Sequence, residues 1–252
     1  MPLTRSHGAS PSPNRLLTFL EPSRASMELG GLMAAAPILL AARQGDGHPV
    51  LVLSGLSGGA GWTRMLRFYL QSLGHSVHAP RFAATKGSSA RVRRLLSERV
   101  DELADQYGAP VSLVAWSVGG CFARQVAAAE PSKVRQVVTL GTPLDGVWYP
   151  KAQRRAAGPL EVPVTSIVSR TDGIFDWKRC VQPRSARAEN VEVPSSHLGM
   201  ATNPFAYHVI ADRLAQPVGS WRPYSPPLPT RAMTRLDRVP LVGGARRVRD
   251  TV

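Results

Sequence analysis

Short apolar runs alternate with amphipathic stretches over residues 48–216, and this alternation limits what the chain can fold into more than any other feature. The first run, residues 49–54, is apolar at nearly every position and ends at Gly55, which is typical of a strand buried on both faces. The pattern predicts further strands at 76–79, 111–116, 134–140, 162–169 and 191–193, and helices at about 62–73, 89–107, 118–129 and 205–214. It therefore predicts an α/β fold, with a mostly parallel sheet of about six strands and helices on both faces.

The two ends of the chain differ from this central part. Residues 1–47 are expected to form an N-terminal tail and an apolar helix, because the uncharged segment 29–42 is shorter than the roughly 20 residues that cross a bilayer. Residues 221–252 are rich in Pro and Arg and are expected to be a disordered basic tail. One α/β domain is predicted between them, over residues 48–220.

Composition excludes several classes of protein. The chain has 31 Lys and Arg against 17 Asp and Glu, a net charge of +14, yet it lacks zinc-finger and RNA-binding signatures, so no nucleic-acid partner is predicted. The two cysteines, Cys121 and Cys180, are too few for a disulfide scaffold and lack the spacing of a metal site. Without a convincing signal peptide or membrane span, the expected location is cytoplasmic, and the basic tail leaves peripheral contact with an anionic membrane open.

The turn after the strand 111–116 holds the most informative residues. In the run Ala115-Trp116-Ser117-Val118-Gly119-Gly120, the serine lies at the tip of a sharp strand-to-helix turn. Such a turn strains the backbone and exposes the hydroxyl above the sheet edge. The pattern alone also fits an ordinary glycine-rich connection, but its place between strand and helix favours a nucleophile. A serine nucleophile then needs a base and an acid that orients the base.

His197 is the candidate base. It follows the strand 191–193 in a polar loop at the carboxyl end of the last predicted strand, and this is the edge where open parallel sheets place their active sites. A capping histidine is the alternative interpretation. The other histidines precede the serine or lie inside a predicted helix: His7, His48, His75, His78 and His208.

Asp172 is the candidate acid. It lies just past the strand 162–169, where its carboxylate could accept a hydrogen bond from His197. Asp176 is the alternative acid, although it could equally cap a helix, and Asp145 is a weaker competitor. The chain order Ser117, Asp172, His197 favours the first assignment, because this order is typical of one class of serine hydrolase.

The glycine-rich segment 54–61 offers backbone N–H groups beside the first strand. It lacks the lysine of a phosphate-binding loop and the glycine spacing of a dinucleotide-binding turn, so neither kind of nucleotide site is predicted there. The N–H groups of Leu56 and Val118 are the candidate oxyanion hole.

Taken together, these segments resemble the α/β-hydrolase superfamily, and small bacterial lipases and carboxylesterases in particular. The matching segments, in chain order, are 53–56, 115–120, 141–143, 169–174 and 196–199. The first glycine usual in the nucleophile turn is Ala115 here, and the connection 144–163 is too short for a large lid, which predicts an open pocket or a small flap.

The resemblance implies a serine hydrolase that cleaves small-molecule or lipid esters without a cofactor, and the sequence shows no metal cluster. It implies an acyl-enzyme intermediate on a Ser117–Asp172–His197 triad, with residues 48–220 as the catalytic domain. A thioesterase or an acyltransferase on the same triad, and a non-catalytic binding protein of this fold, are the alternatives. The oligomeric state is not predicted.

Overall fold

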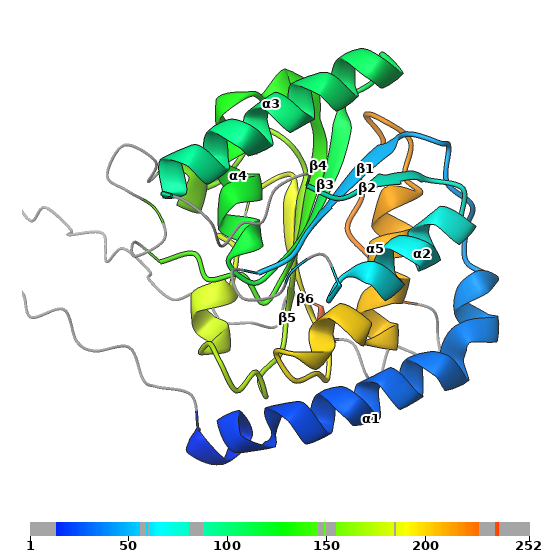
Figure 1. The fold of residues 1–252 in the computed structure, drawn as a ribbon, viewed down its shortest axis with the longest axis vertical. Helices are drawn as coiled ribbons and strands as arrows, with labels where there is room; N and C mark the ends of the chain where they lie inside the picture. The colour runs from blue at the N-terminus through cyan, green and yellow to red at the C-terminus, as the bar shows by residue number, and fades with distance from the viewer. Residues whose placement is uncertain are drawn as a thin grey trace, which may run out of the picture.

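A seven-stranded sheet forms the centre of the fold (Figure 1). The computed structural model describes residues 14–55, 59, 61–80, 88–145, 149, 155–183, 185–226 and 235–236. The strands are β1 (Pro49–Leu53), β2 (Ser76–His78), β3 (Val111–Trp116), β4 (Val134–Leu140), β5 (Val164–Val168), β6 (Ala188–Glu192) and β7 (Arg235–Leu236). In the order β2-β1-β3-β4-β5-β6-β7, all neighbours pair in parallel except β6 and β7, which are antiparallel.

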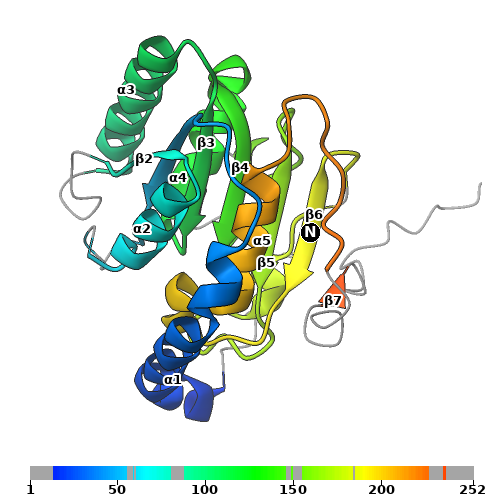
Figure 2. The same cartoon turned by 90° about the vertical axis from the view of Figure 1, so that its right-hand side faces the viewer.

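Helices cover both faces of the sheet (Figures 1 and 2). They are α1 (Arg15–Leu40), α2 (Arg64–Ser72), α3 (Ser89–Tyr107), α4 (Gly119–Ala129) and α5 (Pro204–Leu214), with short 3-10 turns η1 (Pro131–Lys133), η3 (Trp177–Cys180) and η4 (Gly199–Thr202). One apolar core packs β3 residues Val114 and Trp116 against α1, α2 and α5, and the other packs Leu113 and Ala115 against α3 and α4. This alternation of buried side chains follows from the two-residue period of a strand. The predicted α/β fold class is confirmed.

Over residues 48–216, the predicted strands and helices agree with the structure to within a few residues except at β6, whereas strand β7 was not predicted. Strand β6 begins at Ala188, whereas the apolar pattern indicated only residues 191–193. Its start contains Glu189, which is buried beside Arg213 at 2.9 Å and accepts a hydrogen bond from Thr165. Burial raises the pKa of Glu189, and the Arg213 guanidinium opposes this shift. Because this part of the strand contains a charged residue, the hydrophobic pattern did not indicate it.

Helix α1 is much longer than the expected apolar segment 29–42. It begins after Asn14, whose side chain accepts a hydrogen bond from the Leu16 N–H, and it includes Pro22 and Pro37. Leu32 and Leu39 are buried against the core, whereas Phe19, Met27 and Ile38 are exposed. None of the described helices combines the length and the apolar character needed to cross a bilayer.

Part of the segment 221–252 is attached to the core. Tyr224 is buried, and its N–H donates to Glu189, while Arg235–Leu236 form β7 against β6. Residues 227–234 and 237–252, for which disorder was expected, lie outside the described residues. Most arginines of the basic tail, which left membrane contact open, lie there too. The domain boundaries near residues 47 and 220, the membrane contact and the cytoplasmic location stay predictions.

Candidate functional site

Ser117 lies at the strained turn between β3 and α4. Its φ of 57° makes it the only non-glycine residue with positive φ in the described part of the chain. The Ser117 N–H donates to Leu140 O at 2.7 Å, which ties the turn to the end of β4. A Cβ on Gly119 would approach Ser54 O to 2.4 Å, so the helix can start this close to β1 only with glycine there.

Three side chains from three loops form a hydrogen-bonded series at the carboxyl edge of the sheet. Ser117 Oγ lies 3.0 Å from His197 Nε2, and His197 Nδ1 lies 2.7 Å from Asp172 Oδ2. All three residues are buried, with exposures of 8%, 3% and 4% for Ser117, His197 and Asp172. A carboxylate can only accept hydrogen bonds, so Nδ1 carries the imidazole hydrogen and Nε2 presents a lone pair to the serine. The structure thus brings together the three residues proposed from the sequence.

The turn after β5 orients Asp172. Its Oδ1 accepts from the N–H groups of Ile174 and Phe175, each at 2.8 Å, which leaves Oδ2 for His197. The alternative acid, Asp176, caps η3 by accepting from the Lys178 N–H at 3.1 Å. The weaker competitor, Asp145, pairs with Arg179.

Aromatic and glycine residues fix the position of the imidazole. Trp116 Nε1 donates to His197 O at 3.0 Å, and the Phe175 ring meets the imidazole edge to face at 5.2 Å. A Cβ on Gly141 would lie 3.0 Å from His197 Nδ1 and 3.1 Å from Asp172 Oδ2, and its φ is +54°. The absence of a side chain at position 141 therefore leaves room for the His–Asp pair.

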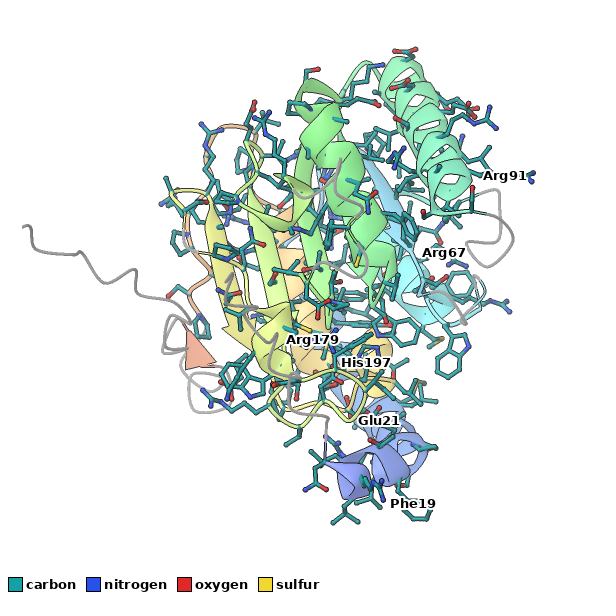
Figure 3. The ribbon with its side chains drawn as sticks, turned by 90° about the vertical axis from the view of Figure 1, so that its left-hand side faces the viewer. Phe19, Glu21, Arg67, Arg91, Arg179 and His197 are labelled. Carbon is teal, nitrogen blue, oxygen red and sulfur yellow. The ribbon has the colours of Figure 1, made fainter. Side chains whose placement is uncertain are left out.

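The carboxylate of Glu21 in α1 joins the turn that carries Asp172 (the acid turn) to the loop that carries His197 (the histidine loop). Its Oε1 accepts from Gly173 N at 2.7 Å and from His197 N at 2.9 Å, and its Oε2 accepts from Leu198 N at 2.7 Å. Figure 3 shows Glu21 of α1 next to His197. Because Glu21 is only 1% exposed, these three donors replace the water that a carboxylate needs.

Two further α1 side chains strengthen the same contact. Glu28, two turns further along α1, accepts from the Ser196 N–H at 2.6 Å and from Asn203 Nδ2 at 2.9 Å. Arg24 donates to Thr171 O at 2.7 Å. The helix therefore holds both loops that carry Asp172 and His197.

Sequence reasoning missed these α1 residues. The spacing of Glu21 and Glu28 places both on one helix face, which is a detectable signal. Their partners, however, are backbone N–H groups 152 and 168 positions away, and such partners leave no local pattern in the sequence.

Of the two residues proposed for the oxyanion hole, Val118 lies in the described part of the chain. Val118 is the N-cap of α4, so its N–H belongs to the positive end of that helix, directly after Ser117. Leu56 lies outside the described residues.

A cleft of about 720 Å³ lies at the opposite edge of the sheet from Ser117. It is lined by residues such as Val134, Pro163 and Trp221, so it is separate from Ser117.

A mostly parallel sheet with helices on both faces, and a serine on a strained strand-to-helix turn beside a histidine, define a protein of the α/β-hydrolase class. Comparison with known proteins agrees. Residues 48–157 match the family described as alpha/beta hydrolase fold, and a triacylglycerol lipase of Burkholderia plantarii is 32% identical over 128 residues, which cover 46% of this chain and 36% of the lipase. The chain therefore has the α/β-hydrolase fold, and residues 48–157 resemble the lipases and esterases of that superfamily.

Solved structures share the fold. Lipase B of Aspergillus fumigatus has a TM-score of 0.58 at 17% identity, covering 68% of this chain and 53% of that one. The Bacillus licheniformis lipase BlEst2 has a TM-score of 0.53 at 14% identity, covering 69% and 95%. A thioesterase domain from the curacin biosynthetic pathway has a TM-score of 0.50 at 16% identity, covering 68% and 92%. The chain thus spans about a third of the curated lipase and about half of the Aspergillus lipase chain.

Proposed function

We propose that this protein is a serine hydrolase that cleaves carboxylic esters of small molecules or lipids. The observation that carries the proposal is the hydrogen-bonded series from Ser117 Oγ through the His197 imidazole to Asp172, at a serine with a φ of 57°. Strain of this kind persists where the surrounding structure imposes it, and here it aims the hydroxyl at a histidine lone pair. The similarity to a lipase supports an ester as the substrate.

The proposed reaction has two halves. Ser117 Oγ forms a bond to the ester carbonyl carbon while His197 Nε2 takes the hydroxyl proton, and Asp172 holds the imidazole and stabilises its positive charge. The N–H groups of Val118 and Leu56 bind the resulting oxyanion. The C–O bond to the alcohol then breaks, and the alcohol leaves with the proton from His197. Water adds to the acyl-enzyme in the same way and releases the acid and the free serine.

An active-site probe tests this proposal directly. A fluorophosphonate should label the full chain once, and mass spectrometry of the digest should place the adduct on Ser117. The labelled protein should lose its hydrolysis of short p-nitrophenyl esters in proportion to the label. A panel of esters and acyl thioesters then separates an esterase from a thioesterase. A chain that stays unlabelled and inactive on the whole panel would instead support a non-catalytic binding protein.

Changing Glu21 to glutamine should weaken catalysis without touching the reacting atoms. The amide NH₂ would face a backbone N–H, so at least one buried donor in the histidine loop loses its acceptor, at a cost of about 1–3 kcal/mol in the free energy of unfolding. Misplacement of His197 by a fraction of an ångström should lower kcat by up to about 100-fold while KM changes little.

The control is Ser26→Ala, because Ser26 lies on the exposed side of the same helix and, among the described residues, its hydroxyl bonds only to Pro22 O in that helix. Steady-state kinetics and thermal unfolding of both variants check the prediction. A Glu21→Gln variant that loses stability but keeps its full kcat would show that α1 only supports the fold.

A further inference from the structure

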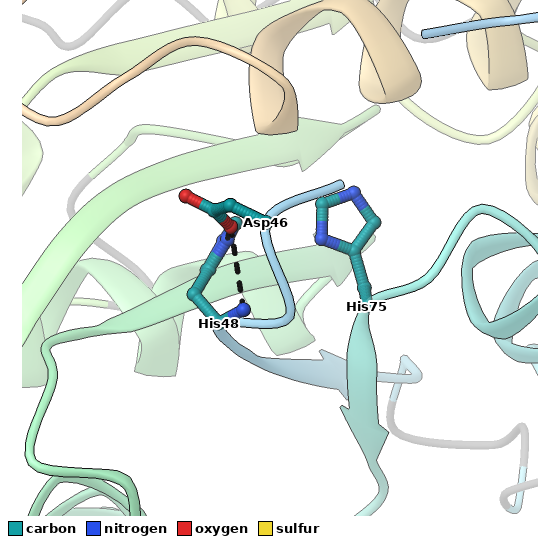
Figure 4. Close-up of side chains that lie close together, drawn as sticks. All are labelled: Asp46, His48 and His75. Carbon is teal, nitrogen blue, oxygen red and sulfur yellow. Dashed lines mark hydrogen bonds and ion pairs between the residues drawn. The ribbon is translucent and has the colours of Figure 1, made fainter. Parts of the chain in front are cut away.

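A second cluster of chemically active side chains lies at the opposite edge of the sheet from Ser117. Asp46 and His48 belong to the connection between α1 and β1, and His75 immediately precedes β2 (Figure 4). Since β1 and β2 begin here, the cluster lies at their amino ends, whereas Ser117 follows the carboxyl end of β3. The ester chemistry proposed above does not use it.

The cluster has the donor atoms of a transition-metal site. One ligand atom of each residue lies within 4.8 Å of the others, and His48 Nδ1 is hydrogen-bonded to the Asp46 carboxylate. The rings of His48 and His75 are nearly perpendicular, with centroids 5.0 Å apart. Two imidazoles and a carboxylate are ligands that Zn²⁺ accepts, with a fourth position left for water.

His75 is the residue that ordinary packing does not explain. It is only 5% exposed, and neither of its ring nitrogens has a hydrogen-bond partner within the described part of the chain. Leaving a buried polar atom without a partner is costly, so such an atom needs a reason. A Cβ on Gly45 would lie 2.4 Å from the His75 ring, so the glycine lets the connection pass directly over the imidazole and confine it.

His48 has a polar partner on the side of its ring that faces away from the cluster. His48 Nε2 lies 2.8 Å from Ser112 Oγ, a fully buried hydroxyl on β3. With a metal on Nδ1, Nε2 carries the hydrogen and donates it to this hydroxyl, as metal ligands usually do to a second group.

We propose that Asp46, His48 and His75 bind one Zn²⁺ ion. Tetrahedral coordination needs ligand atoms about 3.4 Å apart, so the three groups must shift by about an ångström. Asp46 lies on an exposed connection, where such a shift does not disturb the packed core. Arg135 donates to the other Asp46 oxygen at 2.8 Å and neutralises the charge of that carboxylate. We therefore expect a moderate affinity for zinc. The ion ties the end of α1 and the start of β1 to the start of β2.

The test uses the full chain without an affinity tag, stripped of metal with EDTA and titrated with ZnCl₂. Calorimetry should give one ion per chain, and at about 100 times its Kd zinc should raise Tm by roughly 5 °C. Zinc-edge X-ray absorption should show nitrogen and oxygen ligands at about 2.0–2.1 Å without a sulfur shell.

Two variants and a control make the test specific. His75→Gln and Asp46→Asn should each weaken zinc binding at least about tenfold and abolish the Tm rise, while His208→Gln, on α5, should keep both. Circular dichroism shows whether each variant is folded, and the exposed Asp46→Asn change covers the case in which His75→Gln is not. No Tm rise in the parent chain, a rise that survives in either folded variant, or a sulfur shell would overturn the proposal.

Discussion

The Ser117→Ala protein is expected to fold normally and to lose ester hydrolysis by about 10⁶-fold in kcat, because alanine provides no atom to carry the acyl group. The fold should survive because Ser117 Oγ bonds only to His197 among the described side-chain contacts, and the backbone bond from Ser117 N to Leu140 O is unchanged. Alanine tolerates the positive φ no worse than serine, so the turn keeps its shape. Initial rates on short p-nitrophenyl esters, with circular dichroism of the same preparation, measure both effects.

Ser132→Ala is the matched control, since Ser132 is exposed in η1 at the far edge of the sheet. Its rate should equal that of the parent chain. Comparable rates for Ser117→Ala and the parent would remove Ser117 from the reaction, whatever the fluorophosphonate labels.

The meeting of the three candidate residues was predictable because the carboxyl ends of the strands are predictable. Ser117, Asp172 and His197 each follow a strand whose apolar run is visible in the sequence, and carboxyl ends of parallel strands gather at one edge. The three loops that carry Ser117, Asp172 and His197 at that edge could therefore be expected to meet. Their geometry adds what the sequence could not provide: Asp172 faces His197, whereas Asp176 caps η3.

The remaining parts of the structure were hidden for a physical reason. Glu21, Glu28 and the orphaned His75 act through distant backbone groups or buried neighbours, and such partners have no local sequence pattern. Helix α1 itself was underestimated because only its second half is continuously apolar. Its first half is fixed by charged hydrogen bonds to the site loops, so propensity and hydrophobic periodicity could not indicate its start at Arg15.

The Asp172→Asn protein should lose about 10⁴-fold in kcat through the wrong imidazole tautomer. The asparagine oxygen can keep the Oδ1 bonds from Ile174 and Phe175, so its NH₂ must point at His197 Nδ1. An amide N–H facing Nδ1 makes that nitrogen an acceptor and moves the hydrogen to Nε2, where it cannot take the proton of Ser117. The fold and the KM should change little, because every backbone bond of the acid turn is retained.

Asp176→Asn is the matched comparison, since asparagine caps a helix about as well as aspartate does. Its kcat should stay within about twofold of the parent, because its bond to Lys178 N persists. Kinetics of the two variants on the same esters assign the acid directly. If Asp176→Asn carries the large loss while Asp172→Asn remains active, the assignment of Asp172 is wrong, and the acid turn must rearrange when substrate binds.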